Sequence, residues 1–366
     1  MKVSVQASFL TPAGAGGIGV VVVSGGDAAS VIGEIFEGAI PESGELKYGF
    51  LIDVDTGERV DEVLCRRGLS KEMGGHSIFE INGHGGLAVR RRTRDLLRRV
   101  GVDVVSAPDW FREQARYSGV APVTVAACLA LSRVQTRWAA RVLLAQSRGV
   151  LAQAIESREG IGSLLGSLTY GRALIHPPQV VLAGGANVGK STLVNRLLGR
   201  DRVLVNALPG TTRDVVRSVA TLGPLAFEIV DTAGYREVSN EGVESKGIGR
   251  ARESVEKADH VLFLSDSTRL LSSGERNWLE FVESRGEGPR VLRIASKCDR
   301  ADSRPEESFL PISAHTGDGL EGVVEWILEP YRSFLEQGPG EPILFESWMA
   351  EALKEENYEC LLGVTC

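Results

Sequence analysis

The sequence predicts a multidomain α/β protein in which an N-terminal α+β domain and a helical segment precede a domain built on a parallel sheet. Three observations support this order. Short β-rich runs alternate with Gly-rich turns up to about residue 105, and an Ala- and Leu-rich stretch without proline follows over 123–159. Apolar runs then alternate with helical patterns from about 177 to 332. We expect domains at 1–118, 119–176 and 177–332, and a C-terminal helical segment at 333–366.

The N-terminal domain is expected to contain six short strands and two helices. Residues 14–19 match G-x-G-x-x-G, but a strand over 20–23 follows where a dinucleotide-binding unit needs a helix, so we reject that interpretation. The predicted helices lie near 27–36 and 87–100. The predicted strands are 3–9, 18–24, 48–54, 60–65, 77–81 and 102–105.

The second predicted helix carries a run of arginines at positions 90, 91, 92, 94, 98 and 99. We favour a solvated helix face with Leu96 and Leu97 turned inward. Contact with nucleic-acid phosphates is the alternative.

Apolar residues recur at helical spacing over 123–159, which predicts one long helix or a helical hairpin. Glycines over 160–171 and the pair Pro177-Pro178 then predict a linker. Five strands are expected beyond it, at 180–183, 226–230, 261–265, 291–295 and 309–312. A single helix is expected over 343–358.

Composition excludes several classes of protein. Hydrophobic residues make up 43% and charged residues 24% of the chain, as is ordinary for a globular protein, and the net charge of -7 argues against binding nucleic acid by bulk electrostatics. The five cysteines are scattered and contain no CxxC pair, which predicts reduced thiols. No apolar run is long enough for a membrane span, so we expect a cytoplasmic protein with no membrane partner.

Residues 184–191 read GGANVGKS and match the phosphate-binding pattern G-x-x-x-x-G-K-[ST] at every fixed position. The glycines let backbone N–H groups turn toward a polyphosphate, Lys190 neutralises terminal phosphate oxygens, and the Ser191 hydroxyl can ligate Mg²⁺. The alternative is a Gly-rich turn that precedes Lys-Ser by chance. The predicted nucleotide contacts here are Gly184, Asn187, Val188, Gly189, Lys190, Ser191 and Thr192.

Two later segments suit a magnesium and γ-phosphate site. Residues 231–234 read DTAG after a predicted strand, so Asp231 would hold Mg²⁺ through water and the Gly234 N–H would sense the terminal phosphate. Residues 210–214 read GTTRD and form a candidate switch loop. Thr211 would contact the nucleotide there, and Thr212 would complete the Mg²⁺ coordination.

A third segment predicts selection of guanine. Residues 296–299 read SKCD at the end of a predicted strand. The Asp299 carboxylate can accept the two adjacent donors of guanine, N1–H and the exocyclic amine, whereas adenine offers an acceptor at N1. Lys297 would lay its alkyl stem along the base. Ser313 and Ala314 would bring a backbone N–H near the guanine carbonyl oxygen. A carboxylate that only caps a loop is the alternative for Asp299.

In this order, GxxxxGKS, TT, DTAG, SKCD and SA resemble the GTP-binding elements of translation-type G proteins. They are most similar to the tRNA-modification GTPase family (MnmE/TrmE), through 185–191, 209–214 (PGTTRD) and 231–237 (DTAGYRE). Residues 11–25 resemble that family's opening segment, 81–86 its second signature, and 108–119 the segment that leads into its helical domain.

The resemblance implies a P-loop GTPase domain inserted in a helical domain, and an N-terminal domain that binds a tetrahydrofolate derivative and forms a homodimer. It implies GTP hydrolysis to GDP with Mg²⁺ and K⁺, with Asn187 as the potassium ligand. The family works with a flavin-dependent partner enzyme on the wobble uridine of certain tRNAs. Glu244 matches its catalytic glutamate if one inserted residue precedes it, with an exposed switch-region carboxylate as the equal alternative. The expected catalytic residues are Glu244, Lys190 and Thr212.

The chain departs from the family pattern at several positions. Ser296 replaces the usual asparagine, which predicts a shortened or lost brace of the guanine site and weaker guanine binding. Val120 stands where a lysine near the folate is expected, and Val22 where an arginine is expected. The family's closing Cys-Ile-Gly-Lys is missing. The segment that begins at Cys360, CLLG over 360–363, resembles it only loosely. A regulatory or ribosome-assembly GTPase without folate chemistry is therefore the alternative function, and a binding module without turnover is a third.

Overall fold

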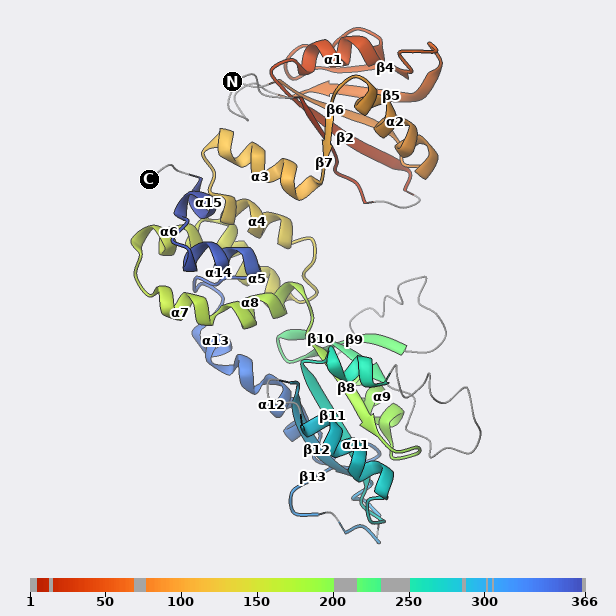
Figure 1. Cartoon of the computed structure of the whole chain (residues 1–366), viewed down its shortest axis with the longest axis vertical. Coiled ribbons are helices and arrows are strands. Elements are labelled where there is room, and N and C mark those ends of the chain that lie inside the picture. The colour runs from red at the N-terminus through yellow and green to blue at the C-terminus, as the bar shows by residue number, and fades with distance from the viewer. Residues whose placement is uncertain are drawn as a thin grey trace. The chain divides into compact units, whose positions relative to one another are not determined.

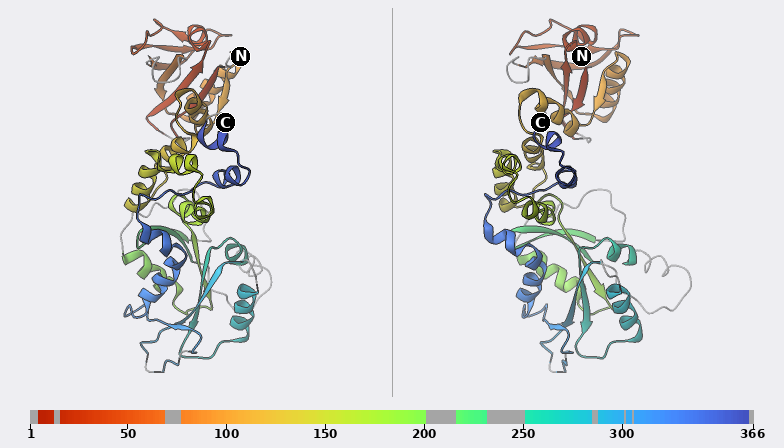
Figure 2. Two further views of the ribbon diagram at one scale, coloured as in Figure 1. Left: turned by 90° about the vertical axis from the view of Figure 1, so that its left-hand side faces the viewer. Right: turned by 60° about the vertical axis from the view of Figure 1, so that its left-hand side comes forward.

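The computed structural model (Figures 1 and 2) describes residues 5–12, 16–68, 77–200, 216–231, 251–284, 288–300, 302–304 and 306–363. The chain divides into two compact units. The first comprises Met1–Leu129, Ala152–Ser157 and Ala352–Cys366, and the second comprises Ala130–Leu151 and Arg158–Glu351. Within the described ranges, no helix is both long and apolar enough to cross a membrane. The four-part division expected from the sequence stays a prediction.

The first unit contains a seven-stranded sheet in the order β3-β4-β5-β6-β2-β1-β7. Its neighbours are antiparallel except β1 and β7, which run parallel. The six predicted strands are present with shifted ends, and β3 is an addition. The strands are β1 (Gln6–Phe9), β2 (Ile18–Gly25), β3 (Phe36–Glu37), β4 (Leu46–Ile52), β5 (Arg59–Arg67), β6 (Ser77–His84) and β7 (Asp103–Val105).

Alternation along the strands divides this sheet into two faces. One face packs on α1 (Ala28–Ile35) and α2 (Leu87–Arg99) in a single apolar core that includes Val21, Ile81 and Leu97. The other face bears Ser24, whose hydroxyl accepts hydrogen bonds from Trp110 Nε1 (2.8 Å) and Gln114 Nε2 (3.2 Å) of α3 (Ala107–Ser118). Each face therefore has its own helical cover (Figure 1).

The second unit contains a six-stranded sheet in the order β13-β12-β11-β8-β10-β9. All neighbours are parallel except β9, an edge strand antiparallel to β10 that the sequence analysis did not predict. Gly223, at φ +58°, lies in the short turn between these two strands. The strands are β8 (Gln179–Gly184), β9 (Val216–Leu222), β10 (Leu225–Asp231), β11 (His260–Asp266), β12 (Arg290–Ser296) and β13 (Leu310–Pro311).

Helices cover both sides of this sheet, as Figure 2 shows. One apolar core joins β8, β10 and β11 to Trp278 and Val282 of α11. α11 begins with a capping box, in which Ser272 and Glu275 each bond the other's backbone N–H. The helices are α9 (Lys190–Arg200), α11 (Ser273–Glu283), α12 (Leu320–Leu328) and the 3₁₀ turn η1 (Glu329–Tyr331).

An aromatic cluster closes the sheet at the strand ends opposite the phosphate-binding motif. His260, at the start of β11, is 2% exposed, and its ring lies 5.7 to 6.3 Å from the rings of Phe227, Trp326 and Tyr331. Its Nε2 lies 3.4 Å from the Tyr331 hydroxyl, and its buried Nδ1 has no hydrogen-bond partner in the described part of the chain. Burial and, to a smaller extent, the charge of Arg290 lower the pKa of His260 to about 4.

Short helices fill the region between the two sheets in sequence and the region after the second sheet, and they correct three predictions. The stretch 123–159 forms three helices rather than one helix or a hairpin, because a turn at 131–136 and Gly149, at φ +95°, interrupt it. The predicted linker over 160–171 instead holds two short helices, and the predicted single helix over 343–358 is two. These elements are α4 (Pro122–Ala130), α5 (Arg137–Ser147), α6 (Val150–Ser157), α7 (Ile161–Gly166), α8 (Leu168–Ile175), α13 (Arg332–Gln337), α14 (Ser347–Lys354) and α15 (Tyr358–Leu362).

An extended segment that follows the six-stranded sheet in sequence, residues 341–345, returns to α5, α7 and α8. Gln146 of α5 donates to the Glu341 carbonyl (2.9 Å), and Ser167 accepts from the Leu344 N–H (2.9 Å). A side chain at Gly171 would place its Cβ 1.9 Å from the Leu344 carbonyl oxygen, so α8 needs glycine there. We call α5, α7, α8 and this segment the helical layer.

Candidate functional site

The phosphate-binding motif forms a loop between β8 and α9. Gly184, Asn187 and Gly189 have positive φ values of +137°, +60° and +102°. A Cβ on Gly184 would lie 2.2 Å from the Leu264 carbonyl oxygen, so glycine is required both for conformation and for space. The loop ends where α9 begins at Lys190, which directs free N–H groups of the helix toward the loop.

Lys190 is the central cation of this loop. Its side chain is 6% exposed, and its Nζ donates to the carbonyls of Gly184 (3.1 Å) and Gly185 (2.7 Å). Burial lowers the pKa of Lys190, and the charges of Asp231 and Glu275 oppose that shift. Because carbonyls are neutral acceptors, the hydrogen bonds of the ammonium become stronger when anionic phosphate oxygens replace them.

The Ser191 hydroxyl and the Asp231 carboxylate meet beside Lys190. Ser191 Oγ donates to Asp231 Oδ2 at 2.7 Å, which joins the first turn of α9 to the end of β10. A hydroxyl and a carboxylate at the end of a parallel sheet are oxygen donors of the kind that Mg²⁺ uses together with phosphates. They fit a magnesium ion that needs nucleotide oxygens to complete its shell. The described ranges contain no group of three or more His, Cys, Asp or Glu residues that could hold a metal by itself.

Asn187 and Thr192 are exposed on this loop and on the first turn of α9. The Asn187 side chain has no hydrogen-bond partner among the residues that the structure describes, so its carbonyl oxygen is available to a cation. Val188 is fully buried, and its carbonyl faces the next element of the site.

An ion pair that sequence reasoning missed lies behind the loop. Glu275 is 3% exposed, receives Arg269 on both oxygens (2.6 and 2.7 Å), and accepts from the Ser272 N–H (2.9 Å). A Cβ on Gly185 would lie 2.5 Å from Glu275 Oε1. The pair therefore forms a wall against which the loop rests. Its only sequence signal is the capping pattern Ser-x-x-Glu.

Ser296 braces the same loop from β12. Its side chain is 2% exposed, and its Oγ lies 2.6 Å from the Val188 carbonyl and 2.8 Å from the Ser265 carbonyl. The brace that was expected to be shortened or lost is therefore present, and the weaker guanine binding stays a prediction. The end of β12 lies close enough to the loop for a hydroxyl to reach it.

Lys297 and Asp299 follow at the end of β12. Lys297 has φ +63°, and its Nζ forms an ion pair with Asp266 Oδ2 (2.6 Å) at the end of the neighbouring β11. Burial alone would raise the pKa of Asp266, but hydrogen bonds from Lys297 and Thr268 hold it below the usual range. The hydroxyl of Ser313 lowers the pKa of Asp299, so this carboxylate is an acceptor at neutral pH.

Residues 313–318 form a tight turn next to Asp299. Ser313 is 1% exposed; its N–H donates to the Asp318 carbonyl (2.9 Å), and its own carbonyl accepts from Gly317 (2.8 Å). The Ala314 N–H has no partner among the described residues. It is thus an unused donor on the side of the turn that lies away from Gly317.

Four predicted site residues lie outside the described residues, namely Thr211, Thr212, Gly234 and Glu244. The described members form two groups. Lys190, Ser191 and Asp231 meet at the phosphate end, whereas Lys297, Asp299, Ser313 and Ala314 surround the expected base position. Val188 joins the groups through Ser296.

The resemblance implies a folate-binding domain in the first unit, with a lysine expected at Val120 near the folate and an arginine expected at Val22. Val22 is 3% exposed and pairs in register with Glu80, whose carboxylate accepts from Asn82 (3.0 Å) and lies 3.8 Å from Arg66. Val120 is 40% exposed. Both expected cations, the lysine near the folate and the arginine after the glycine-rich opening, are thus valines in this chain. The residue present at position 120 does not fit a folate held by a lysine there.

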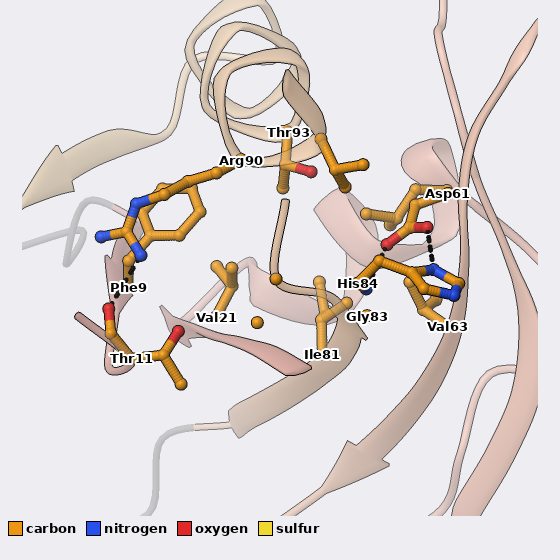
Figure 3. A pocket seen from close by; sticks show the side chains of 14 residues that line it. Phe9, Thr11, Val21, Asp61, Val63, Ile81, Gly83, His84, Arg90 and Thr93 are labelled. Carbon is orange, nitrogen blue, oxygen red and sulfur yellow. Dashed lines mark hydrogen bonds and ion pairs between the residues drawn. The ribbon is translucent and has the colours of Figure 1, made fainter. Parts of the chain in front are cut away.

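A separate hollow lies on the opposite face, between α2 and the core strands (Figure 3). It measures about 350 Å³ counted to its open mouth. Asp61 accepts from the His84 N–H (2.8 Å) and pairs with His84 Nδ1 (2.7 Å), which raises the pKa of His84. A Cβ on Gly83 would lie 2.2 Å from Asp61 Oδ2. The GHGG sequence over 83–86 therefore shapes this rim of the domain.

Most of the arginine run on α2 is used within the first unit. Leu96 and Leu97 are fully buried beneath it, as predicted. Arg90 donates to the Thr11 carbonyl and stacks on Phe9, Arg94 lies over the same ring, Arg92 pairs with Glu58, and Arg99 pairs with Asp53 and Asp55. These contacts favour a helix face that pairs with its own domain, rather than a surface that binds nucleic-acid phosphates.

Comparison with known proteins gives matches for both units. Residues 6–115 match the family described as GTP-binding protein TrmE N-terminus, and 179–297 match the family described as 50S ribosome-binding GTPase. A tRNA modification GTPase MnmE from Syntrophobacter fumaroxidans is 33% identical over 76% of this chain and 69% of its own length. The protein of the same name from Thermus thermophilus is 30% identical over 95% of this chain and 86% of its own, and that from Geobacter sulfurreducens is 29% identical over 89% and 81%.

Proposed function

Because the chain belongs to the MnmE family of tRNA modification GTPases, it binds and hydrolyses GTP in tRNA modification, and we propose that the loop 184–191, Asp231, Lys297 and Asp299 form its nucleotide site. One observation carries this proposal. The Ser191 hydroxyl and the Asp231 carboxylate lie 2.7 Å apart, next to an ammonium whose hydrogen-bond partners among the described residues are two carbonyls. This set of groups is complementary to a magnesium-bound triphosphate.

On nucleotide binding, the Lys190 ammonium exchanges its carbonyl partners for β- and γ-phosphate oxygens. Ser191 and Asp231 hold Mg²⁺, with Thr212 as a further ligand, and the ion neutralises charge on those oxygens. The Gly234 N–H donates to the γ-phosphate, and Thr211 contacts the nucleotide beside Thr212. Because Lys190 and Ser191 are held at the start of α9 before the reaction, they stabilise the transition state without reorganisation.

Water is oriented by Glu244 in this proposal, because Tyr235 stands where many small G proteins have a glutamine. Asn187 holds K⁺, which supplies positive charge beside the β- and γ-phosphates. The Asn187 side chain, which is exposed and has no hydrogen-bond partner within the described ranges, supports that role. In this proposal, the GTPase domains of two copies of the chain form a homodimer.

Guanine is selected at the other end of the site. The ionised Asp299 accepts N1–H and the 2-amino group, while the stem of Lys297, whose amine is tied to Asp266, covers the base. The free Ala314 N–H donates to the guanine O6, in a turn organised by Ser313.

The test is GTP turnover in KCl against NaCl, with the protein concentration varied. We expect turnover that needs K⁺ and rises per molecule with concentration. The variant Glu244→Ala should lose at least about a hundredfold in turnover and keep GDP affinity, since positioned acid–base groups typically contribute that much. Turnover that is absent in both salts while GTP stays bound contradicts the catalytic assignment, and a loss below about threefold contradicts the role of Glu244.

A second candidate function is a GTPase of this family that acts without folate, in regulation or ribosome assembly. The buried Val22 and the exposed Val120 favour it, because neither supplies a cation to a folate. Titration of the full chain with a tetrahydrofolate derivative distinguishes the two. Binding with micromolar affinity, together with co-elution of tRNA and the flavin-dependent partner enzyme, supports modification chemistry, and the absence of both supports the second function.

A further inference from the structure

Arg196 lies in the middle of α9, on the same helix as Lys190 and Ser191, and has no part in the site described so far. Its Nε donates to the Ala314 carbonyl at 2.9 Å, and its Nη2 donates to the His315 carbonyl. The planar guanidinium therefore holds two consecutive backbone carbonyls at once, a fork geometry that a lysine cannot reproduce.

The residues held in this way belong to the turn that carries the unused Ala314 N–H. The peptide before Ala314 is fixed from the other side, because the Ser313 carbonyl accepts from Gly317 (2.8 Å) and the Thr316 N–H donates to Ser313 Oγ (3.0 Å). In a trans peptide the N–H points opposite to the carbonyl, so the Ala314 N–H points away from the turn. With the following two carbonyls held by Arg196, this donor has a single direction.

We propose that Arg196 is a positioning residue for guanine recognition, which aims the Ala314 N–H at the guanine O6 by clamping the Ala314 and His315 carbonyls to α9. This inference rests on the proposed function. Because α9 begins at the phosphate loop and carries the clamp along its length, one rigid helix sets the distance between the phosphate contacts and the O6 donor. An arginine that only stabilises the turn is the competing explanation.

The two explanations differ in what they predict for modified bases. 6-Thioguanosine diphosphate keeps N1–H and the 2-amino group but replaces O6 with a poorer acceptor, so the GDP to 6-thio-GDP affinity ratio reports the Ala314 contact. Inosine diphosphate lacks the 2-amino group, so the GDP to IDP ratio reports Asp299.

The experiment measures the affinity of the full chain for GDP, 6-thio-GDP, IDP and ADP in the wild type and in Arg196→Met. We expect Arg196→Met to bind GDP about three- to tenfold more weakly and to lose most of the 6-thio-GDP discrimination, with an unchanged IDP ratio. Asp299→Asn should lose most of the discrimination between GDP and IDP and keep the GDP to 6-thio-GDP ratio. Arg276→Met is the matched control, because Arg276 is an exposed arginine that donates to a carbonyl (Leu271, 3.2 Å) away from the turn.

Equal weakening of all three guanine-type ligands by Arg196→Met would overturn the inference, since a merely structural role lowers affinity without changing the ratios. Full retention of the 6-thio-GDP ratio in Arg196→Lys would overturn the two-carbonyl clamp. If the wild type binds GDP no better than ADP, the proposed guanine site fails first, and this outcome is separate from a failure of Arg196 alone.

Discussion

Acidification should destabilise the second unit through one buried side chain, His260. In the fold its pKa is about 4, and in the unfolded chain it returns to 6.5. Between these values the unfolded state binds a proton that the folded state does not, so the free energy of unfolding falls as the pH falls from about 6.5 toward 4. At pH 7.5 and above, His260 is neutral in nearly all molecules of both states and adds almost no pH dependence.

The size of this effect follows from the two pKa values. At pH 5 the unfolded-state pKa lies about 1.5 units above the pH, so proton binding lowers the free energy of unfolding by about 2 kcal/mol. At pH 7.5 this contribution is close to zero. The structural cause is that an imidazolium would be enclosed by the rings of Phe227, Trp326 and Tyr331 beside the charge of Arg290. No carboxylate among the described residues forms an ion pair with it.

The assay is urea unfolding followed by tryptophan fluorescence at pH 7.5 and pH 5, in the wild type and in His260→Leu, which keeps a similar volume and cannot titrate. Other groups titrate in both proteins and cancel in the comparison. The variant should therefore gain about 2 kcal/mol relative to the wild type between the two pH values. His260→Asn, which keeps polarity, should show the same pH dependence as His260→Leu. Parallel curves for the wild type and both variants would refute the reasoning.

Three further predictions concern single contacts. Ser296→Ala should weaken GDP binding about three- to tenfold by removing the brace to the loop, while Ser296→Asn keeps it; equal affinities in a fluorescent-GDP displacement assay would contradict this. Gly185→Val should lower GDP affinity at least about tenfold with unchanged circular dichroism, because its Cβ meets the fixed carboxylate of Glu275; wild-type affinity would show that the wall yields. Trp110→Phe should lower the stability of the first unit by about 1 kcal/mol in urea unfolding, since Ser24 loses a donor, and an unchanged midpoint would contradict that contact.

Local chemistry made parts of this fold predictable from sequence. The phosphate loop needs glycine at Gly184 and Gly189 and a lysine at the start of the helix. These residues lie within one short stretch of sequence, so a motif can identify them. Strands with clear alternation were found for the same reason. β9 was missed although the Gly223-Pro224 pair between two β-rich runs is a hairpin signal.

Other features depend on distances that the fold sets. Ser296 keeps a brace because the end of β12 lies near Val188. The sequence alone does not give the distance between these two segments. The clamp of Arg196 joins α9 to a turn more than a hundred residues later in sequence, and this proximity arises from strand order. Helix ends in 123–175 were misplaced because the same apolar period runs through several short helices, which the turn at 131–136 and Gly149 interrupt.

The helical layer also constrains the order in which the chain can fold during synthesis. All strands of the six-stranded sheet have emerged once residue 311 has left the ribosome. Ile343, Leu344 and Phe345, which are at most 2% exposed, follow later and fill the space between α5, α7 and α8. The GTPase sheet can thus form as a contiguous unit, whereas α5 and α8 must wait with uncovered apolar faces for a segment made more than a hundred and fifty residues after them.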